Sequence, residues 1–348
     1  MKKERLYQID LFRFIAAVLV VFYHYTFRGF NSTIKLSPTA FNTLEGYTKY
    51  GYLGVDLFFI ISGFVIIMSI ENSSTLHFIK SRIVRLYPAY WVCLLLTSLV
   101  TIIFVNNNAI SIKQFLFNFT MLNGYFNIPH IDGVYWSLLV EIKFYFLIAI
   151  MLSFTFLRKN FNALILLWLI ITIINVLPAI SSSKLFYYLN NYLILEYSSY
   201  FIAGYYFYVI YTRKIKLKIG FIFVSICFLL SVVNALERIS RLNHYYSSNF
   251  NAITIISILT VFYLAFSLLV VRKLNFLNKR LFLTLGLITY PLYLIHQNIG
   301  YFLLNQFSSL NKYLILISLI FLMLFLSYFI NQFFEKKIGH FLKEKLNL

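Results

Sequence analysis

Ten apolar segments, each of roughly 17 to 23 residues, follow one another along most of this chain. An α-helix of about 20 residues spans the roughly 30 Å of hydrocarbon in a bilayer, so each segment can cross a membrane. We place them at residues 9–28, 52–70, 86–105, 134–156, 161–178, 191–211, 219–235, 251–271, 282–304 and 313–334. Because 61% of the 348 residues are hydrophobic, we predict one all-α, multi-pass transmembrane domain over residues 1–348, with no soluble domain appended.

The distribution of basic residues along the chain explains its net charge of +19. They gather in alternate connecting segments, from residues 2–5 and 80–85 to residues 336–345. Basic residues are in excess on the cytoplasmic side of membrane proteins, so we predict that both termini lie in the cytoplasm. The lipid bilayer therefore explains the basicity, and we expect no nucleic acid partner.

Ionisable residues inside the apolar segments are the main functional signal. In the predicted topology His24, Asp56, Glu141 and His296 all lie in the outer half of the bilayer. Such groups cost several kcal/mol in hydrocarbon unless they face a bundle interior or a wet cavity. We predict that the four share one polar cavity, in which a carboxylate orients an imidazole as a general base. The alternative is a structural polar network that joins helices.

The first segment carries Arg13 and His24 eleven positions apart. At about 100° per residue they share one helix face, roughly 16 Å apart along the axis. Asp10, one turn before Arg13, is expected to pair with it. A snorkelling arginine and an interfacial histidine would be the ordinary explanation of each residue alone, but together on one face they favour a function.

Two further sets of residues bear on ligands. Arg82 and Arg85 lie three apart on one helix face near the cytoplasmic end of the third segment, a spacing that suits phosphate recognition, although topology and lipid headgroups also favour basic residues there. Cys93 and Cys227 both fall inside apolar segments, so we expect buried thiols, no disulfide framework and no metal site.

Several motifs together resemble the membrane-bound acyltransferase family 3, the integral-membrane O-acyltransferases of bacteria. They are Asp10-Leu11-Phe12-Arg13 followed by His24, Gly54-Val55-Asp56-Leu57-Phe58-Phe59 with Ser62-Gly63-Phe64, Arg82-x-x-Arg85, Trp136-Ser137-Leu138-x-x-Glu141, and Tyr290-x-x-Tyr293-Leu294-x-His296. The set covers most of the chain in one order. Glu335-Lys336-Lys337 departs from the pattern, because it has a lysine where a proline is expected.

The resemblance implies ten core helices in the bacterial cytoplasmic (inner) membrane, in the form without an extracytoplasmic domain. It implies transfer of an acyl group, usually acetyl, to a hydroxyl of a surface polysaccharide or lipid-linked glycan. Acyl-CoA, most often acetyl-CoA, would be a co-substrate rather than a tightly bound cofactor, and polysaccharide assembly proteins would be possible partners. The acceptor, the acyl group and the oligomeric state stay open.

The resemblance also assigns roles. His24 would be general base or acyl relay, oriented by Glu141 or Asp56, and His296 a second proton carrier or structural partner. Acyl-donor binding is assigned to Arg13, Arg82 and Arg85, and support of the acceptor site to Asp10, Trp136, Ser137, Tyr290 and Tyr293. Ser62 or Ser137 as a nucleophile ranks lower, because no Gly-x-Ser-x-Gly elbow is present.

Two other functions fit the same residues. A glycan transporter or flippase would use the polar layer as a substrate or proton path. A non-catalytic scaffold in polysaccharide assembly would keep its function without His24.

Overall fold

The computed structural model describes residues 5–71, 73–105, 110–177, 180 and 183–348. Lys2 and Lys3 of the predicted basic N-terminus, and the asparagines at 106–108, lie outside the described residues. The helices and helical turns are α1 (Tyr7–Tyr23), η1 (His24–Arg28), α2 (Gly29–Asn31), α3 (Glu45–Thr48), η2 (Lys49–Leu53), α4 (Gly54–Ile70), α5 (Thr75–Val100), η3 (Thr101–Val105), α6 (Ile112–Phe119), η4 (Asn123–Phe126), η5 (Gly133–Tyr135), α7 (Trp136–Ser153), α8 (Thr155–Lys159), α9 (Phe161–Asn175), α11 (Lys184–Leu193), α12 (Leu195–Tyr211), α13 (Leu217–Tyr246), α14 (Ala252–Val270), η6 (Asn275–Leu277), α15 (Phe282–Gln306), α16 (Lys312–Ile330), η7 (Asn331–Glu335) and α17 (Lys336–Leu346).

Each predicted apolar segment coincides with a helix, and the described residues contain no strand, so the prediction of an all-α polytopic membrane protein is confirmed. Seven helical stretches of the described chain are long and apolar enough to cross a membrane. They are Tyr7–Asn31, Glu45–Ile70, Thr75–Phe104, Gly133–Ser153, Leu217–Tyr246, Ala252–Val270 and Lys312–Leu346. Of the other three predicted spans, α9 is a shorter apolar helix. The count of ten spans and the cytoplasmic termini stay predictions.

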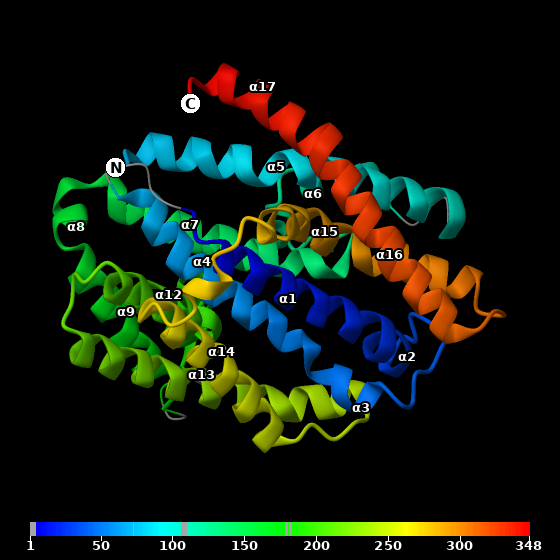
Figure 1. The fold of residues 1–348 in the computed structure, drawn as a ribbon, viewed down its shortest axis with the longest axis horizontal. Helices are drawn as coiled ribbons and strands as arrows, with labels where there is room; N and C mark the ends of the chain where they lie inside the picture. The colour runs from blue at the N-terminus through cyan, green and yellow to red at the C-terminus, as the bar shows by residue number, and fades with distance from the viewer. Residues whose placement is uncertain (1–4, 72, 106–109, 178–179, 181–182) are drawn as a thin grey trace. The chain divides into compact units, whose positions relative to one another are not determined.

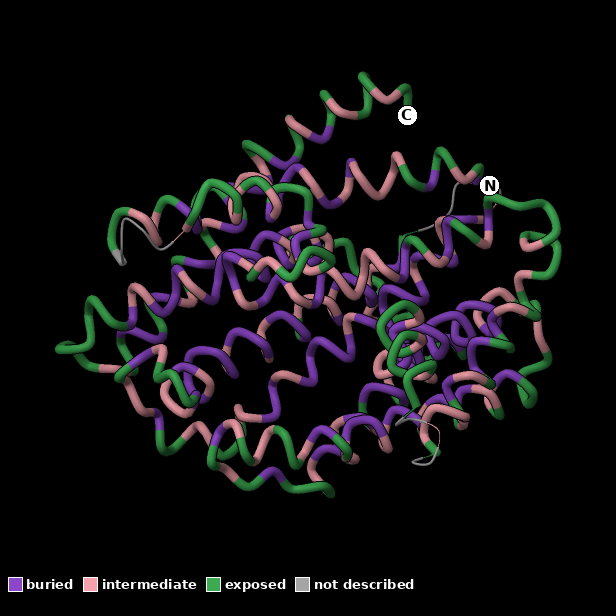
Figure 2. The backbone as a smooth tube through the Cα atoms, turned by 180° about the vertical axis from the view of Figure 1, so that it is seen from behind, coloured by how far each residue is buried: buried purple, intermediate pink, exposed green. Residues whose placement is uncertain are grey.

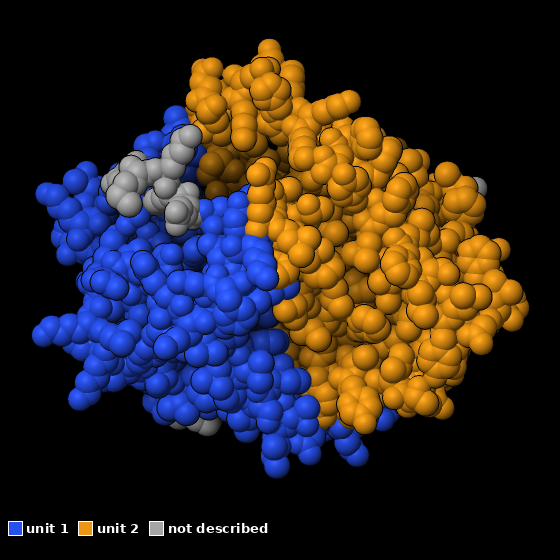
Figure 3. Space-filling view, in the orientation of Figure 1, with its two compact units in different colours: residues 1–12, 55–79, 140–279 blue, residues 13–54, 80–139, 280–348 orange. Residues whose placement is uncertain are grey.

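The chain divides into two compact units, drawn in different colours in Figure 3. Unit 1 comprises residues 1–12, 55–79 and 140–279, and unit 2 comprises residues 13–54, 80–139 and 280–348. Each unit therefore draws on three separated parts of the sequence. The prediction of a single transmembrane domain stays a prediction.

Unit 1 is organised around α12, which packs against α9, α13 and α14. Nearly every residue of α12 is buried, so this helix has no face of its own for solvent or lipid. It approaches α4 closely at Gly63 and Gly204, where an added Cβ on Gly63 would lie 2.2 Å from the carbonyl oxygen of Phe201. Small residues allow two helix backbones to touch in this way, so the close approach requires glycine.

Unit 2 is organised around α15, which packs against α16, η1, η3, η5 and η7. Pro291 lies inside α15 and has no N–H to donate, which leaves the carbonyl of Leu287 without its helical partner. The side chain of Asn331 donates to that carbonyl over 3.4 Å. The proline is thus accommodated by a neighbouring helix, as membrane helices allow.

The C-terminal helix α17 lies alongside α5 in unit 2 (Figure 1). Lys80 Nζ, in α5, donates to the carbonyl of Leu346 over 2.7 Å. Exposed and half-buried residues dominate α17, next to the label C in Figure 2. This basic helix therefore joins the end of unit 2 that carries Arg82 and Arg85.

Candidate functional site

Two histidines meet inside unit 2, one from each of its two central helical segments. His24 begins the π-helix η1 that continues α1, and His296 lies in α15, five residues after Pro291. His296 Nε2 is 3.1 Å from His24 Nδ1, and both side chains are buried. Between Arg13 and His24 the chain is α-helical through Tyr23, as the predicted shared face requires.

The partners of the two rings determine which nitrogens carry protons. His24 Nδ1 lies 2.8 Å from the carbonyl oxygen of Val20, and His296 Nδ1 lies 2.8 Å from that of Tyr293. A carbonyl only accepts, so we assign a proton to both Nδ1 atoms. In the neutral pair the single Nδ1 proton of His24 is shared between the Val20 carbonyl and His296 Nε2, and His24 Nε2 keeps its lone pair. His24 Nε2 is therefore the basic nitrogen of the pair.

Arg28 and Gln297 complete the surroundings of this basic nitrogen. Arg28 Nη1 lies 3.4 Å from His24 Nε2 and donates to Gln297 Oε1 over 3.3 Å. Arg28 is one helical turn past His24 in the same segment, and Gln297 follows His296 in α15. A cation thus lies beside the nitrogen that would handle a proton, where it can stabilise developing negative charge.

A second set of contacts fixes α15 against the start of α7. Ser137 Oγ and Tyr293 Oη form a hydrogen bond of 2.7 Å, which brings together two residues predicted to support the acceptor site. Tyr25 Oη donates to the carbonyl of His296 over 2.7 Å. Gly300 makes room for that tyrosine, because a Cβ there would lie 2.3 Å from its ring. These contacts fix the position of His296.

Asp132 precedes the membrane-spanning stretch that begins at Gly133, and it is completely buried. Its oxygens accept hydrogen bonds from the backbone N–H of Val134, at 3.1 Å, and of Asn298, at 3.0 Å. Burial raises the pKa of Asp132 to about 6, although these bonds and Arg28 favour the charged form. Asp132 thus ties the loop before α7 to the segment of α15 that follows His296.

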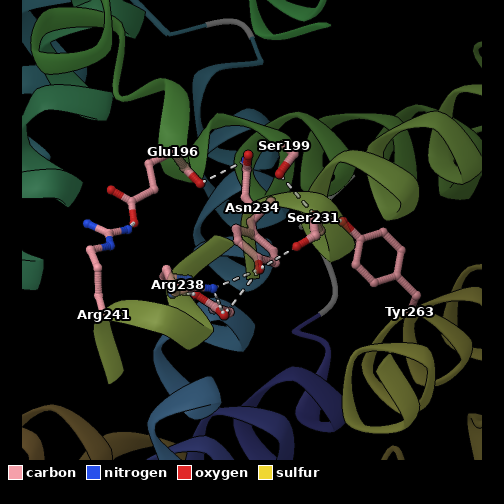
Figure 4. A network of polar contacts seen from close by, with 9 residues as sticks. Glu196, Ser199, Ser231, Asn234, Arg238, Arg241 and Tyr263 are labelled. Carbon is pink, nitrogen blue, oxygen red and sulfur yellow. Dashed lines mark hydrogen bonds and ion pairs between the residues drawn. The ribbon is translucent and has the colours of Figure 1, made fainter. Parts of the chain in front are cut away.

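Asp56, predicted near the histidines, has its partners within unit 1. Arg238 of α13 donates to Asp56 Oδ1 over 3.2 Å and to Asp56 Oδ2 over 2.6 Å, and Tyr200 donates to Oδ2 over 3.1 Å. Only 1% of the Asp56 side chain and 11% of the Arg238 side chain are exposed. Figure 4 shows Arg238 in a polar network of α12, α13 and α14 that includes Ser231 and Tyr263, whose hydroxyls lie 2.7 Å apart.

Glu141 is also held within unit 1. It accepts a hydrogen bond from Ser62 Oγ at 2.7 Å and from Tyr145 Oη at 2.5 Å. The structure thus brings together Ser62 and Glu141, and separately His24 and His296. The prediction that Asp56 and Glu141 share the cavity of the histidines, and that one of them orients His24, stays a prediction.

At the predicted donor end of unit 2, Arg85 has protein partners. Its Nη1 donates to Glu335 Oε1 over 2.7 Å, and its guanidinium lies 5.5 Å from the centre of the Tyr290 ring. Glu335 also accepts from Asn331 Nδ2 over 2.8 Å. Arg82 donates to Ser81 Oγ over 3.3 Å. A phosphate would therefore compete with Glu335 for Arg85.

The remaining predicted residues are placed as follows. Asp10 accepts two hydrogen bonds from Arg5, of 2.8 and 3.1 Å, and its pairing with Arg13 stays a prediction. Arg13 and Trp136 are half-buried. Cys93 and Cys227 are free and buried, as expected. Across the part of the chain that the structure describes, no three His, Cys, Asp or Glu residues are grouped to hold a metal ion.

Sequence reasoning missed several residues that the structure brings into these sites: Arg28, Gln297, Asn298, Asp132, Arg238 and Glu335. Arg28 is the last residue of the first predicted segment, and Arg238 lies beyond the predicted end of the seventh. Arg238 lies in α13, which ends at Tyr246, eleven residues past the predicted end at 235. The four-residue spacing from His24 to Arg28 was the one available signal, because residues four apart share a helix face.

Comparison with known proteins supplies the family. A family model described as "Acyltransferase domain" matches residues 6–332. The chain belongs to the acyltransferase family 3. Membership of this family agrees with the motifs described above.

One curated relative is Nodulation protein 10 of Rhizobium leguminosarum bv. viciae, 29% identical over 176 residues. That alignment spans 45% of this chain and 47% of the relative. No solved structure matches this chain.

Proposed function

We propose that this protein is an O-acyltransferase that carries an acyl group, most often acetyl, from cytoplasmic acyl-CoA to a hydroxyl of a surface polysaccharide or lipid-linked glycan. The observation that carries the proposal is the His24–His296 pair, in which the proton assignment leaves His24 Nε2 as a base beside Arg28. We propose the bacterial inner membrane as its location, with polysaccharide assembly proteins as possible partners.

In the proposed reaction, the acceptor hydroxyl oxygen attacks the thioester carbonyl carbon of the donor. His24 Nε2 takes the hydroxyl proton as the C–O bond forms. The tetrahedral intermediate carries its charge on the former carbonyl oxygen, where the Arg28 guanidinium stabilises it. The C–S bond then breaks, and the proton returns from His24 to the thiolate of CoA. A relay through acyl-His24 uses the same nitrogen.

The donor is proposed to enter from the Arg85 end of unit 2. Arg82 and Arg85 suit the phosphates of CoA because guanidinium groups bind phosphate oxygens in a planar fork. Arg85 already lies beside Glu335 and Tyr290, so donor binding would displace the carboxylate of Glu335. Arg13, roughly 16 Å before His24 along α1, is proposed to line the path of the thiol arm.

The first test compares the surface polysaccharide of the host by NMR. The gene is deleted, then restored as wild type, as His24→Ala, or as His244→Ala at equal membrane abundance. His244 is an exposed histidine in α13 and serves as the matched control. We expect the O-acyl signals to vanish on deletion, to return with wild type and His244→Ala, and to stay about 10² to 10⁴-fold weaker with His24→Ala.

The alternatives predict other results. A transporter or flippase would leave acylation unchanged while polysaccharide export falls on deletion. A scaffold would keep full acylation with His24→Ala. Either result would show that His24 is not the catalytic base.

A further inference from the structure

A cleft of about 500 Å³ lies in unit 2 near the end of α15. It is lined by Leu36, Val100, Thr101, Phe104, Asn298, Tyr301, Phe302, Asn305 and Gln306. None of these nine residues carries a charge. Amide and hydroxyl groups supply its polar lining, and the rings of Phe104 and Phe302 stack with their centres 5.0 Å apart. The cleft thus combines neutral hydrogen-bonding groups with an aromatic surface.

The wall of the cleft is linked to the basic nitrogen by side chains in contact. Asn298 Oδ1 accepts from Gln297 Nε2 over 3.2 Å, and Gln297 Oε1 accepts from Arg28 Nη1 over 3.3 Å. The same Nη1 lies 3.4 Å from His24 Nε2. Tyr301, another lining residue, has its ring centre 6.4 Å from that of His24. A ligand in the cleft would therefore lie next to the His24 environment.

Helix length places the cleft far from the predicted donor end. Thr101, which begins η3 directly after α5, is sixteen residues past Arg85, which is about 24 Å of helix axis. Along α15, Gln306 is sixteen residues past Tyr290, again about 24 Å, and His296 is only about 9 Å past Tyr290. Arg85 and Tyr290 are neighbours, so the two helices give the same separation. The histidine pair lies between the two ends.

We propose that this cleft is the acceptor site and that it binds an uncharged sugar residue of a carbohydrate. The inference rests on the proposed function, which requires an acceptor to reach His24 from the side opposite the donor. Amide and hydroxyl side chains match sugar hydroxyls, and the Phe104–Phe302 pair offers a ring face for the apolar side of the sugar. The cleft has no cation to bind the phosphates of CoA, which would need one.

An acyl chain is the main competing occupant, and the lining argues against it. Asn305 donates its amide N–H to the carbonyl of Leu36 over 3.1 Å, which leaves its amide oxygen and the exposed Gln306 amide for a ligand. An acyl chain would cover these groups without supplying hydrogen bonds, which costs free energy for each group left unsatisfied. The outer residues of the cleft lie on an exposed part of α15, where Asn305 and Gln306 are accessible. A carbohydrate therefore fits the chemistry better than a lipid tail.

The first experiment uses binding and needs no catalysis. Gln306→Cys is introduced into the full-length protein, whose native Cys93 and Cys227 are buried. Maleimide labelling is timed with and without de-O-acylated oligosaccharides released from the surface polysaccharides of the host. Ser309→Cys, exposed three residues further on, is the matched control. We expect saturable slowing of at least fivefold at position 306 and none at 309. Equal labelling rates at position 306, or slowing by a fatty-acyl detergent alone, would overturn the proposal.

The second experiment separates acceptor from donor by kinetics. Phe302→Ala removes one ring of the aromatic pair, and Phe321→Ala, exposed on α16, is the control. We expect Phe302→Ala to raise the acceptor KM about tenfold while the acyl-CoA KM and the Tm stay unchanged. An unchanged acceptor KM would overturn the proposal. If wild-type protein transfers no acyl group at all, the proposed function fails, and the labelling experiment still decides whether the cleft binds the oligosaccharides.

Discussion

Asp56 with Arg238 in unit 1 and His24 with His296 in unit 2 are both buried pairs of side chains, but they use their hydrogen bonds differently. Asp56 and Arg238 are opposite charges that satisfy one another, with Tyr200 as a third partner. The two histidines are neutral in the assigned tautomers, and each directs its Nδ1 proton at a backbone carbonyl. Only the second pair retains an unprotonated nitrogen that can take a proton without breaking an ion pair.

Burial of an ionisable group is therefore not by itself a sign of catalysis. A buried carboxylate whose charge is fully compensated holds helices together, and removing its partner leaves an uncompensated charge. A neutral imidazole, by contrast, can gain a proton and lose it again during a reaction. We therefore rank His24 above Asp56 as the reacting group.

The largest expected effect is on stability and tests the role given to unit 1. Arg238→Ala leaves Asp56 buried without its cation, and we expect a loss of roughly 3–5 kcal/mol in the free energy of unfolding. Unfolding in detergent, followed by near-UV circular dichroism, measures it. Arg241→Ala is the control, because the Arg241 side chain, which pairs with Glu196, is 66% exposed.

A double variant separates a charge effect from a general loss of packing. Asp56→Asn with Arg238→Gln removes both charges and keeps polar groups of similar shape, so we expect it to be more stable than Arg238→Ala. If the double variant is stable but loses all acyl transfer, Asp56 takes part in the reaction and the ranking above is wrong.

Helix phase and membrane depth could be read from the sequence because they depend only on residue spacing. These arguments found His24 and His296, and the family resemblance added Tyr293 and Ser137. The structure brings each of these two pairs into contact in unit 2. They also grouped Asp56 and Glu141 with the histidines, since four groups at similar depth look alike in a sequence. Which helices are neighbours is a property of tertiary packing, and spacing along the chain does not contain it.

The missed partners have specific physical causes. Arg238 looked like a loop residue because hydropathy falls off before α13 ends at Tyr246. Glu335 lies one residue past the last predicted apolar segment, and no spacing in the sequence links it to Arg85, which binds it from 250 positions earlier. Asn298 and Gln297 are ordinary polar residues of a helix in the sequence. Only the structure shows that Asn298 lines the cleft and accepts a hydrogen bond from Gln297.

A smaller effect is expected on the pH dependence of stability, through Asp132 in unit 2. The pKa of Asp132 is raised to about 6, while an unfolded aspartate has a pKa of about 3.9. Between these values the folded protein binds a proton that the unfolded chain does not. The contribution of Asp132 to the free energy of unfolding is therefore largest below about pH 4 and falls by roughly 2–3 kcal/mol as the pH rises to 6.

In Asp132→Asn this fall in the free energy of unfolding with rising pH should be absent, because asparagine does not titrate. Thermal unfolding of wild type, Asp132→Asn and Glu237→Gln from pH 4 to 8 measures it, with the exposed Glu237 as control. We expect the Tm of wild type to fall relative to Asp132→Asn between pH 4 and 6, and the difference to stay constant above that range. Parallel curves for all three proteins would show that Asp132 titrates normally.

The smallest effect concerns the second histidine. His296 accepts from His24 Nδ1 but has no assigned contact with substrate, so we expect it to position His24 rather than react. Because one hydrogen bond contributes about 1 kcal/mol, His296→Ala should lower kcat about fivefold and leave both KM values unchanged. His296→Gln should recover part of the loss, because its amide oxygen can accept near the former Nε2. A loss as large as that of His24→Ala, with no recovery by glutamine, would instead make His296 a proton carrier and join the two histidines into one catalytic unit.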